Sequence, residues 1–428
     1  MVEGPKSPND LKARADAGDA SAQYAFSSAL SGAGRREEAR HWLEQAAASG
    51  HPDAIYTLSA AWLTGANGVP REPKRGAAGV RRAAALGSAF AHCALAALHA
   101  GGLAVECDWS AACDHLAEAI SRGHAGAMRM AAMVFFMADP DDLDGAALIE
   151  SSARLDGVAG AIAVRRAALR RRGASSKTAR ELVPRLRQAR YPIVEALEAA
   201  LHGAAPIEEA PGAVDPDRLL AKLKRQSFDA GSSVQQLCER PNVRTISAAF
   251  TPEECDYMIG VAAPRLERAM INDDNVDEAR IDPRRTAWNA SLHPGSADLP
   301  FVLYAQRLSM LAAVSYKQGE TLNILRYRIG EEYRPHHDFL ASSERDLARR
   351  GQRIRTALIY LNEDFEGGET HFLMPDIKFL GAPGDVIVFD NVDEEGRPDV
   401  SARHASLPVR RGEKWIASLW FRDQPYEF

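Results

Sequence analysis

Cysteine is scarce in this sequence, and the few cysteines are scattered. The chain of 428 residues holds five of them, with no CxxC pair and no spacing typical of a zinc site. We therefore expect the cysteines to stay reduced in a cytoplasmic protein and to be buried as small hydrophobes. They are Cys93, Cys107, Cys113, Cys238 and Cys255.

Long apolar runs and an excess of positive charge are absent as well. No run of 18 uncharged apolar residues occurs, and the N-terminal stretch MVEGPKSPNDLKARADAG has no apolar core, so the sequence predicts neither a membrane span nor a secretory signal. The formal net charge of -6 argues against a nucleic-acid or anionic-membrane binder. The one dense basic run, Arg165 to Arg172, is expected to be a solvated helix end.

The N-terminal part of the chain repeats itself. A glycine followed four residues later by an alanine recurs at steps of 32, 37, 36 and 34 residues, a period typical of a helix-turn-helix solenoid. Each glycine is expected to end a helix, and each alanine to let the next helix pack closely. The pairs are Gly18/Ala22, Gly50/Ala54, Gly87/Ala91, Gly123/Ala127 and Gly157/Ala161.

This register resembles Sel1-like repeats, which are related to tetratricopeptide repeats. The resemblance is carried by AAASGHPDAIYTLSAAWLTGANGV, residues 46 to 69, and extends over roughly residues 10 to 170. Such arrays bind other proteins on a concave face. We expect a helical repeat domain over residues 10–201. The alternative is that the array only caps or dimerises the rest of the chain.

A linker and a change of pattern follow the repeats. The stretch HGAAPIEEAPGAVDP, residues 202–216, is rich in proline, glycine and alanine and predicts a linker. Beyond it, short β-branched and aromatic runs predict strands: TLNILRYRI, RTALIYLNEDF, DVIVFD and KWIASLWF. Thr251 and Glu254 form a capping-box pattern that predicts the start of a helix. We expect residues 217–428 to form a sheet-rich domain that folds without the repeats.

The stretch YRIGEEYRPHHDF predicts a metal site. In a strand, His336 and Asp338 point to one face and His337 to the other, so the first and third residues of HHD can share one ion. The next strong candidate ligand is His404, far enough along the chain for a jelly roll to bring the strands side by side. Two histidines and one carboxylate on one face are typical of non-haem Fe(II) sites with open positions.

Lys414 indicates a second ligand at the same site. It follows His404 by ten residues, and Arg410 to Glu413 suggest a hairpin turn between them. In that hairpin Lys414 lies roughly 16 Å along the sheet from the metal. An ammonium at this distance can anchor the far carboxylate of 2-oxoglutarate while the keto acid end chelates the iron.

The second half of the chain resembles the catalytic domain of prolyl 4-hydroxylases from about residue 242 to residue 422. The resemblance is carried by FTPEECDYMI and by five ordered motifs: YxxGxxYxxHxD from Tyr327, GQRIRTALIYLN from Gly351, EGGETHF from Glu366, PGDVIVF from Pro383 and HASLPVRRGEKW from His404. It implies a double-stranded β-helix with iron bound by His336, Asp338 and His404. It further implies that 2-oxoglutarate is held by Lys414, Tyr327 and Thr370.

The same resemblance places Tyr333, Arg353 and Trp420 in the substrate groove. An aromatic residue in a strand is also a common core residue, and this reading stays open for Tyr333, Trp420 and Tyr327. His337 and His371 are expected to have no role in the site, and the role of Arg355 is open. The chain departs from the family where Ala287-Trp288 follow Arg285-Thr286 and where His404-Ala405-Ser406 replaces HAG, so the substrate stays undefined.

The sequence therefore predicts an Fe(II)- and 2-oxoglutarate-dependent dioxygenase that uses O2, with ascorbate as an accessory reductant. We expect a prolyl residue in a protein or peptide as the substrate, docked by the repeat domain. One alternative is a hydroxylase of a free amino acid or other small molecule, with the repeats used for assembly. The other is an inactive scaffold, against which the intact ligand set and Lys414 argue. The oligomeric state is left open.

Overall fold

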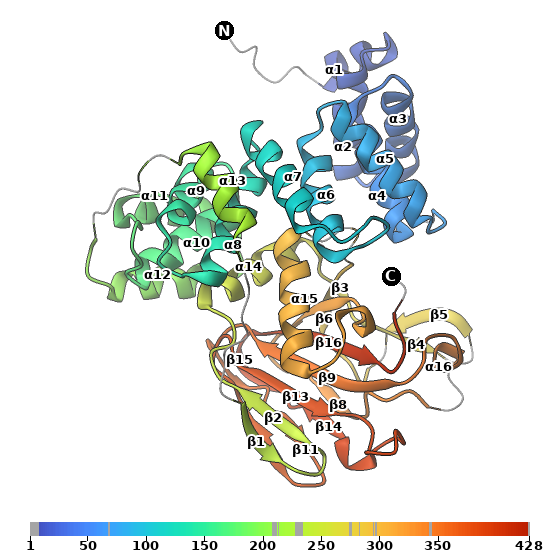
Figure 1. The fold of residues 1–428 in the computed structure, drawn as a ribbon, viewed down its shortest axis with the longest axis vertical. Helices are drawn as coiled ribbons and strands as arrows, with labels where there is room; N and C mark the ends of the chain where they lie inside the picture. The colour runs from blue at the N-terminus through green and yellow to red at the C-terminus, as the bar shows by residue number, and fades with distance from the viewer. Residues whose placement is uncertain are drawn as a thin grey trace. The chain divides into compact units, whose positions relative to one another are not determined.

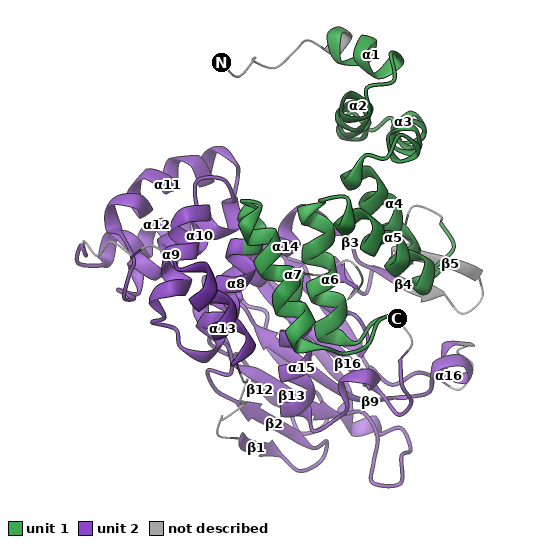
Figure 2. Cartoon of the chain, turned by 45° about the horizontal axis from the view of Figure 1, so that its top comes forward, with its two compact units in different colours: residues 1–127, 294–299 green, residues 128–293, 300–428 purple. Residues whose placement is uncertain are grey.

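The structure is a computed structural model that describes residues 8–66, 69–207, 212, 214–226, 234–273, 276–281, 283–293, 295, 298–341 and 345–426. The chain divides into two compact units (Figure 2). Unit 1 comprises residues 1–127 and 294–299, and unit 2 comprises residues 128–293 and 300–428. None of the described helices is both long enough and apolar enough to cross a membrane.

Unit 1 is built from consecutive antiparallel helices (Figure 1). Their starts follow N-cap residues, as at Asp19, Ser88 and Asp108, whose side chains accept a hydrogen bond from the first turn. The helices are α1 (Pro8–Asp16), α2 (Ala20–Gly32), α3 (Arg36–Ala48), α4 (Pro52–Thr64), α5 (Pro73–Ala85), α6 (Ala89–Gly101) and α7 (Trp109–Ser121).

The predicted glycine and alanine register is confirmed in the first four repeats. Their glycines have φ between 75° and 99° just after a helix, a conformation that L side chains rarely adopt. The paired alanines are at most 1% exposed. At Gly157 the expectation that the glycine ends a helix is wrong, because Asp156 is the N-cap and Gly157 is the first residue of α10 (Gly157–Ala168). The exposed Leu155 stands where the earlier repeats have glycine.

The helical array continues in unit 2. Its next helices are α8 (Ala125–Ala138), which begins at the end of unit 1, α9 (Leu143–Ser152), α10, α11 (Ser176–Gln188) and α12 (Val194–Gly203). After the stretch expected to be a linker, α13 (Pro216–Lys224) returns to this array. Lys222 forms ion pairs there with Asp142 and Asp144 at α9.

The basic run from Arg165 to Arg172 is not a solvated helix end, so that expectation is wrong. Arg166 is 1% exposed, and Arg165 binds the buried Asp256 at 2.7 Å. Arg171 binds the buried Glu253 at 3.0 Å. Both carboxylates lie on α14 (Pro252–Ala262), the helix whose predicted capping box at Thr251 is present. The run therefore joins the helical array to the sheet-rich part of unit 2.

The sheet-rich part contains two larger antiparallel sheets (Figure 1). The first has the order β1-β2-β13-β9-β16-β7-β6-β3 and the second the order β12-β11-β14-β8. The predicted runs form β7 (Leu322–Tyr327), β9 (Arg353–Tyr360), β13 (Val386–Asp390) and β16 (Lys414–Arg422), which are neighbours in the first sheet. Most residues of these strands are buried, on both faces of the sheet, although β9 and β16 also carry arginine, threonine, serine and lysine.

The remaining elements complete this fold. The strands are β1 (Val234–Cys238), β2 (Val243–Ile246), β3 (Glu267–Arg268), β4 (Met270–Asp273), β5 (Val276–Ile281), β6 (Trp288–Leu292), β8 (Tyr333–His336), β10 (Phe365–Gly367), β11 (Thr370–Phe372), β12 (Ile377–Phe379), β14 (His404–Ser406) and β15 (Val409–Gly412). The helices are α15 (Leu299–Ala312) and α16 (Arg345–Arg350).

The core of the sheet-rich part lies between the two sheets. Buried residues from both sheets, including Tyr327, Tyr360, Phe372 and Phe389, form one apolar cluster. The arrangement agrees with the predicted double-stranded β-helix. It brings β8 and β14, which are distant in sequence, side by side at one edge of the cluster.

Candidate active site

His336, Asp338 and His404 meet between β8 and β14. His404, the first residue of β14, pairs directly with His336, the last residue of β8, and Asp338 follows two residues later. One ligand atom from each side chain lies within 4.8 Å of the others. The His336 and His404 Nε2 atoms are 3.4 and 3.8 Å from the Asp338 carboxylate oxygens. Among the described residues no other group of three or more histidine, cysteine or acidic side chains brings its ligand atoms together in this way.

Hydrogen bonds orient each of these side chains. The Nδ1 atoms of His336 and His404 lie 2.9 and 3.0 Å from backbone carbonyls, so Nδ1–H donates and the Nε2 lone pair faces the site. Thr356 Oγ1 donates to Asp338 Oδ2 at 2.8 Å and accepts from Asn391 Nδ2 at 2.9 Å. Two imidazole nitrogens and one carboxylate fit a ferrous ion and leave coordination positions open.

Burial sets the charges of the site. It lowers the pKa of His404 to about 4, with help from the neighbouring His336. Burial alone would raise the pKa of Asp338, but the two histidines hold it well below its ordinary value. Near pH 7 the site therefore holds neutral imidazole at His404 and an ionised carboxylate, the forms that bind a metal ion.

Lys414 occupies the other end of the same cavity. It is fully buried, and its Nζ donates to the Gly368 carbonyl at 2.5 Å and to Ser406 Oγ at 3.0 Å. Burial lowers its pKa to about 7. The cavity is lined by both ligand histidines and Lys414 and also by Tyr327 and Thr370. The predicted cosubstrate residues are thus brought together.

The expected hairpin between His404 and Lys414 is wrong. β14 pairs with β8 and β11 in the second sheet, whereas β16 pairs with β7 and β9 in the first. Between them β15 pairs with β10. Pro408, which has no N–H to donate, stands where the chain leaves β14. Lys414 therefore reaches the cavity from the opposite sheet, and its neighbour across the strands is Tyr327.

The predicted groove residues have different surroundings. The Tyr333 ring stacks on His336 with a centroid distance of 3.4 Å, and both Tyr333 and Trp420 line the cavity. The Arg353 guanidinium forms a two-point ion pair with Glu320, at 2.7 and 2.9 Å, and lies 4.1 Å from the Trp420 ring centroid. Arg353 thus contacts the wall residue Trp420 but is not among the residues that line the cavity.

Sequence reasoning missed several residues of the site. Thr356 and Asn391 hold Asp338, and Arg285 lies over the Tyr333 ring at 5.2 Å. Ser406, noted only as a departure from HAG, contacts Lys414. The sequence could have indicated Thr356, because side chains alternate along β9. Arg355, its neighbour, lies on the other face and binds Asp390. His337 lies outside the site, as predicted, with Nε2 3.1 Å from the Val400 carbonyl.

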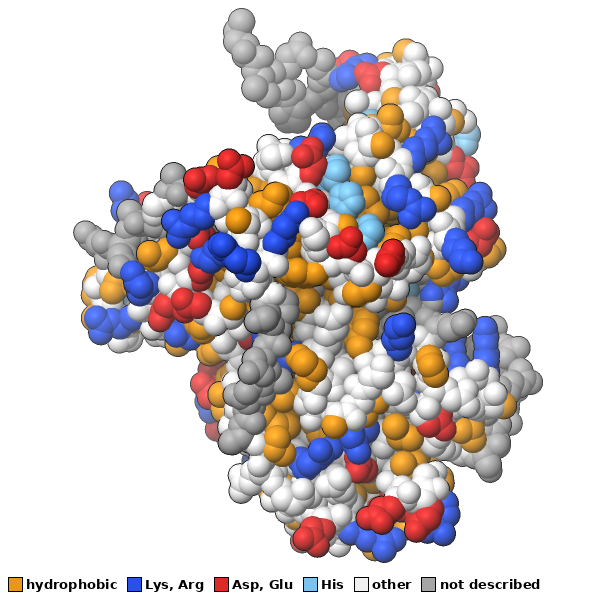
Figure 3. Space-filling view, in the orientation of Figure 1, with side chains coloured by type: hydrophobic (Ala, Val, Ile, Leu, Met, Phe, Trp, Pro, Cys, Tyr) orange, Lys and Arg blue, Asp and Glu red, His pale blue; other side chains and the backbone are white. Residues whose placement is uncertain are grey.

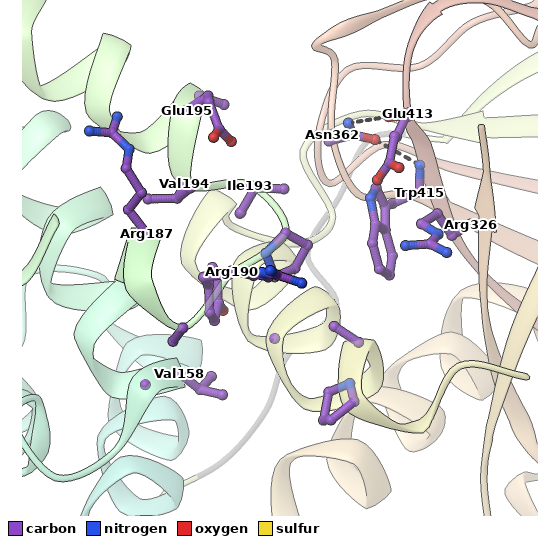
Figure 4. A pocket seen from close by; sticks show the side chains of 18 of the residues that line it. Val158, Arg187, Arg190, Ile193, Val194, Glu195, Arg326, Asn362, Glu413 and Trp415 are labelled. Atoms are coloured by element: carbon purple, nitrogen blue, oxygen red, sulfur yellow. Dashed lines mark hydrogen bonds between the residues drawn. The ribbon is translucent and has the colours of Figure 1, made fainter. Parts of the chain in front are cut away.

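A larger cleft of about 1110 Å³ lies elsewhere in unit 2 (Figure 4). Figure 4 shows the segment around Arg190 and Ile193 on one side and Arg326 beside Trp415 on the other. Arg326 is part of a cross-strand stack, 5.2 Å from the Trp288 centroid and 5.7 Å from the Trp415 centroid. The cleft contains none of the candidate metal ligands.

Comparison with known proteins gives matches to the second half of the chain. Residues 322–422 match the family described as 2OG-Fe(II) oxygenase superfamily. Prolyl 4-hydroxylase 1 of Arabidopsis thaliana is 30% identical over 198 residues, which cover 43% of this chain and 70% of that protein. Probable prolyl 4-hydroxylase 7 of the same plant is 29% identical over 232 residues, which cover 49% of this chain and 73% of that protein.

Two solved structures also align. A viral collagen prolyl hydroxylase from Paramecium Bursaria Chlorella virus-1 is 24% identical, with a TM-score of 0.33, over 44% of this chain and 98% of that chain. A Sel1 repeat protein from Oxalobacter formigenes is 32% identical, with a TM-score of 0.25, over 28% of this chain and 92% of that chain.

Proposed function

The chain belongs to the prolyl 4-hydroxylase family of 2OG-Fe(II) oxygenases, and on that premise we propose that it hydroxylates prolyl residues of a protein or peptide. It is a 2-oxoglutarate-dependent dioxygenase. One observation carries the proposal: the His336, Asp338 and His404 cluster opens on a cavity that also holds the buried Lys414.

His336, Asp338 and His404 would hold the ferrous ion. When bound, it supplies the oxidising chemistry, in which O2 is consumed, 2-oxoglutarate is decarboxylated to succinate and one oxygen atom enters the substrate. Thr356 keeps Asp338 in place through its hydrogen bond to Oδ2. Such a contact fixes a ligand before the metal arrives.

Lys414, Tyr327 and Thr370 would bind 2-oxoglutarate through its far carboxylate. The Lys414 ammonium is the cation of this end of the cavity, and the Thr370 hydroxyl is held by Tyr360 at 2.8 Å. Lys414 is fully buried at this end of the cavity, and burial strengthens a contact between opposite charges. Burial raises the pKa of Tyr327 to about 12, so its hydroxyl keeps its proton and can donate.

Tyr333 and Trp420 would form the walls that receive the substrate. Among the described residues, Trp420 Nε1 is buried without a hydrogen-bond partner, and Trp420 lines the cavity. An unpaired buried donor on a cavity wall is suited to a peptide carbonyl. Arg353, which lies against Trp420 and is paired with Glu320, would keep this wall in position.

The helical array would dock the protein that carries the target proline. In unit 2 the segment between α11 and α12 shares a cleft with the start of β16, so a bound chain can contact both parts of this unit. Repeat arrays commonly bind extended partners in this way.

Mass spectrometry tests the substrate class. The protein, loaded with Fe(II), 2-oxoglutarate and ascorbate, is incubated with proline-containing peptides and host protein extract, beside the His404→Ala variant. We expect succinate formation and a gain of one oxygen, about 16 Da, on prolyl residues with the natural protein alone. Oxidation of free amino acids without any oxidised peptide would instead identify a small-molecule hydroxylase.

A further inference from the structure

A cluster of histidines lies outside the candidate active site, in unit 1. His92 and His99 are two turns apart on α6, and His115 faces them from α7. The His115 ring centroid is 5.2 Å from that of His92 and 5.6 Å from that of His99. Figure 3 shows histidine side chains gathered on one face over these helices.

The nearest nitrogens of this cluster are positioned as a pair. His92 Nδ1 and His115 Nδ1 are 3.1 Å apart. His92 forms another hydrogen bond with the Ala84 carbonyl, so its second nitrogen carries the proton and its Nδ1 lone pair faces His115. His115 supplies the same arrangement when its proton sits on Nε2. An ion bound by both nitrogens would take the place of the hydrogen bond that they share in its absence.

The charged state of the pair also suits a metal ion. Burial lowers the pKa of His92, and it lowers the pKa of His115 to about 4, with further lowering by the neighbouring histidines. Both rings are therefore neutral near pH 7, the form that binds metal ions. Glu118 supplies negative charge three residues after His115, although Arg122 binds it at 2.6 Å.

We propose that His92 and His115 bind a divalent late transition metal, such as Zn²⁺, at a site separate from the active site. An ion about 2.1 Å from both nitrogens, at their 3.1 Å spacing, would make an angle of about 95° between them, which such ions accept. The ion would link α6 to α7, and water would fill its other positions.

Calorimetric titration with Zn²⁺ tests this site in the full chain carrying His336→Ala and His404→Ala, which removes the active-site ligands. We expect one ion per chain. Adding His115→Asn should weaken binding at least tenfold, since asparagine keeps a hydrogen-bonding group near Nδ1 but lacks the imidazole. His41→Asn, at an exposed histidine of α3, is the matched control and should leave binding unchanged.

Thermal unfolding separates loss of a ligand from loss of structure. In EDTA, the His115→Asn chain should unfold at the temperature of its parent, and Zn²⁺ should raise the unfolding temperature of the parent alone. The proposal is overturned if the parent takes up no Zn²⁺, or if the His115→Asn chain binds it as tightly.

A different observation carries a second inference, which rests on the proposed function. Ser406 replaces the glycine of the family pattern HAG, is 8% exposed and lines the cavity. Its Oγ accepts a hydrogen bond from Lys414 at 3.0 Å. Ser406 also shares a hydrogen bond with the Tyr327 hydroxyl. We infer that Ser406 Oγ accepts from Lys414 and from Tyr327 and donates its own proton to the far carboxylate of 2-oxoglutarate, so that this chain binds the cosubstrate by an additional contact.

Titration of 2-oxoglutarate into the Fe(II) protein, followed by charge-transfer absorption, tests Ser406. We expect Ser406→Gly to weaken 2-oxoglutarate roughly two- to tenfold and to leave 2-oxobutyrate, which lacks the far carboxylate, unchanged. Equal binding of 2-oxoglutarate by both proteins refutes the role of Ser406. Failure of the natural protein to bind 2-oxoglutarate refutes the proposed function itself.

Discussion

His336 and His337 are neighbours in the chain with unrelated surroundings. His336 belongs to the ligand cluster, whereas His337 stacks on Phe339 and lies against the Val400 carbonyl. We expect His336→Ala or His404→Ala to abolish Fe(II) binding at the active site and 2-oxoglutarate decarboxylation. His337→Ala should leave both largely intact. Anaerobic Fe(II) titration with 2-oxoglutarate absorption measures this, and an equal loss in His337→Ala would contradict the assignment.

Lys414 permits a quantitative prediction. An ammonium–carboxylate contact in this buried pocket should contribute about 1.5 to 3 kcal/mol, so Lys414→Ala should weaken 2-oxoglutarate binding roughly ten- to a hundredfold. Fe(II) affinity should stay nearly unchanged, because the ligands lie at the other end of the cavity. Lys414→Arg should recover only part of the loss, because the guanidinium keeps the positive charge but is bulkier and places its donors differently. Unchanged 2-oxoglutarate affinity in Lys414→Ala would remove this residue from the site.

The lowered pKa of Lys414, about 7, predicts how cosubstrate binding depends on pH. Below about pH 7 the free protein already carries the ammonium, so binding is constant. Above that pH the lysine must take up a proton when the carboxylate binds, and affinity should fall by up to tenfold per pH unit. Titrations between pH 6 and 9 measure this, and Lys414→Ala should lose the dependence. A flat profile in the natural protein would show that Lys414 stays charged.

The candidate ligand residues could be named from the sequence because the evidence for them is local. The spacing HHD pointed to His336 and Asp338, although β8 ends at His336 and Asp338 lies in the bend that follows, and ordered motifs pointed to His404 and Lys414. The contacts of Thr356 with Asp338 and Asn391 depend on how β9 pairs with β13. No spacing in the sequence states that register, so these supporting residues required the structure.

At the scale of elements, α10 and α14 carry the connection within unit 2. Asp256 is 2% exposed, and burial raises its pKa despite the ion pair with Arg165. We expect Arg165→Ala to destabilise the protein by about 3 kcal/mol, because it leaves a buried carboxylate without its cation. Arg187→Ala, which breaks an exposed pair with Glu198, should change the free energy of unfolding by less than about 1 kcal/mol. Urea denaturation compares them, and equal effects would refute the distinction.

The same contacts bear on truncation. A chain that begins at Asp217 keeps Glu253 and Asp256 on α14 but loses Arg165 and Arg171. We therefore expect it to be unstable, in contrast to the independent folding that the linker indicates. Circular dichroism and solubility measure this. A stable, Fe(II)-binding fragment would show that α14 tolerates the loss of its partners.

Element identity was more predictable than element pairing. β7, β9, β13 and β16 follow from runs of β-branched and aromatic residues, which report directly on burial. The connection from β14 to β16 was predicted wrongly as a hairpin. The turn-like residues Arg410 to Glu413 are equally compatible with a chain that crosses from the second sheet to the first. At Gly157 the glycine and alanine spacing persists while the helix start shifts, so spacing alone misplaced the helix end.

At the scale of the whole molecule, composition separated a repeating, alanine-rich half from a strand-rich half. It did not reveal that helices α9 to α13 group with the strands in one compact unit. The ion pairs that join them come from residues far apart in the chain, such as Arg165 and Asp256. A run of charged residues does not indicate which distant residues it will contact. The prediction that Arg165 to Arg172 is solvated was wrong for this reason.

Arg326 lies between the rings of Trp288 and Trp415, so the fluorescence of these tryptophans should depend on whether the first sheet is intact. Trp415 is 1% exposed, so its fluorescence should be emitted at short wavelength and shift to longer wavelength when the first sheet opens. Trp420, on the same strand, lines the cavity and lies against a guanidinium. Its emission should change when the cavity fills, so ligand entry and sheet opening can be followed by light in the unlabelled protein.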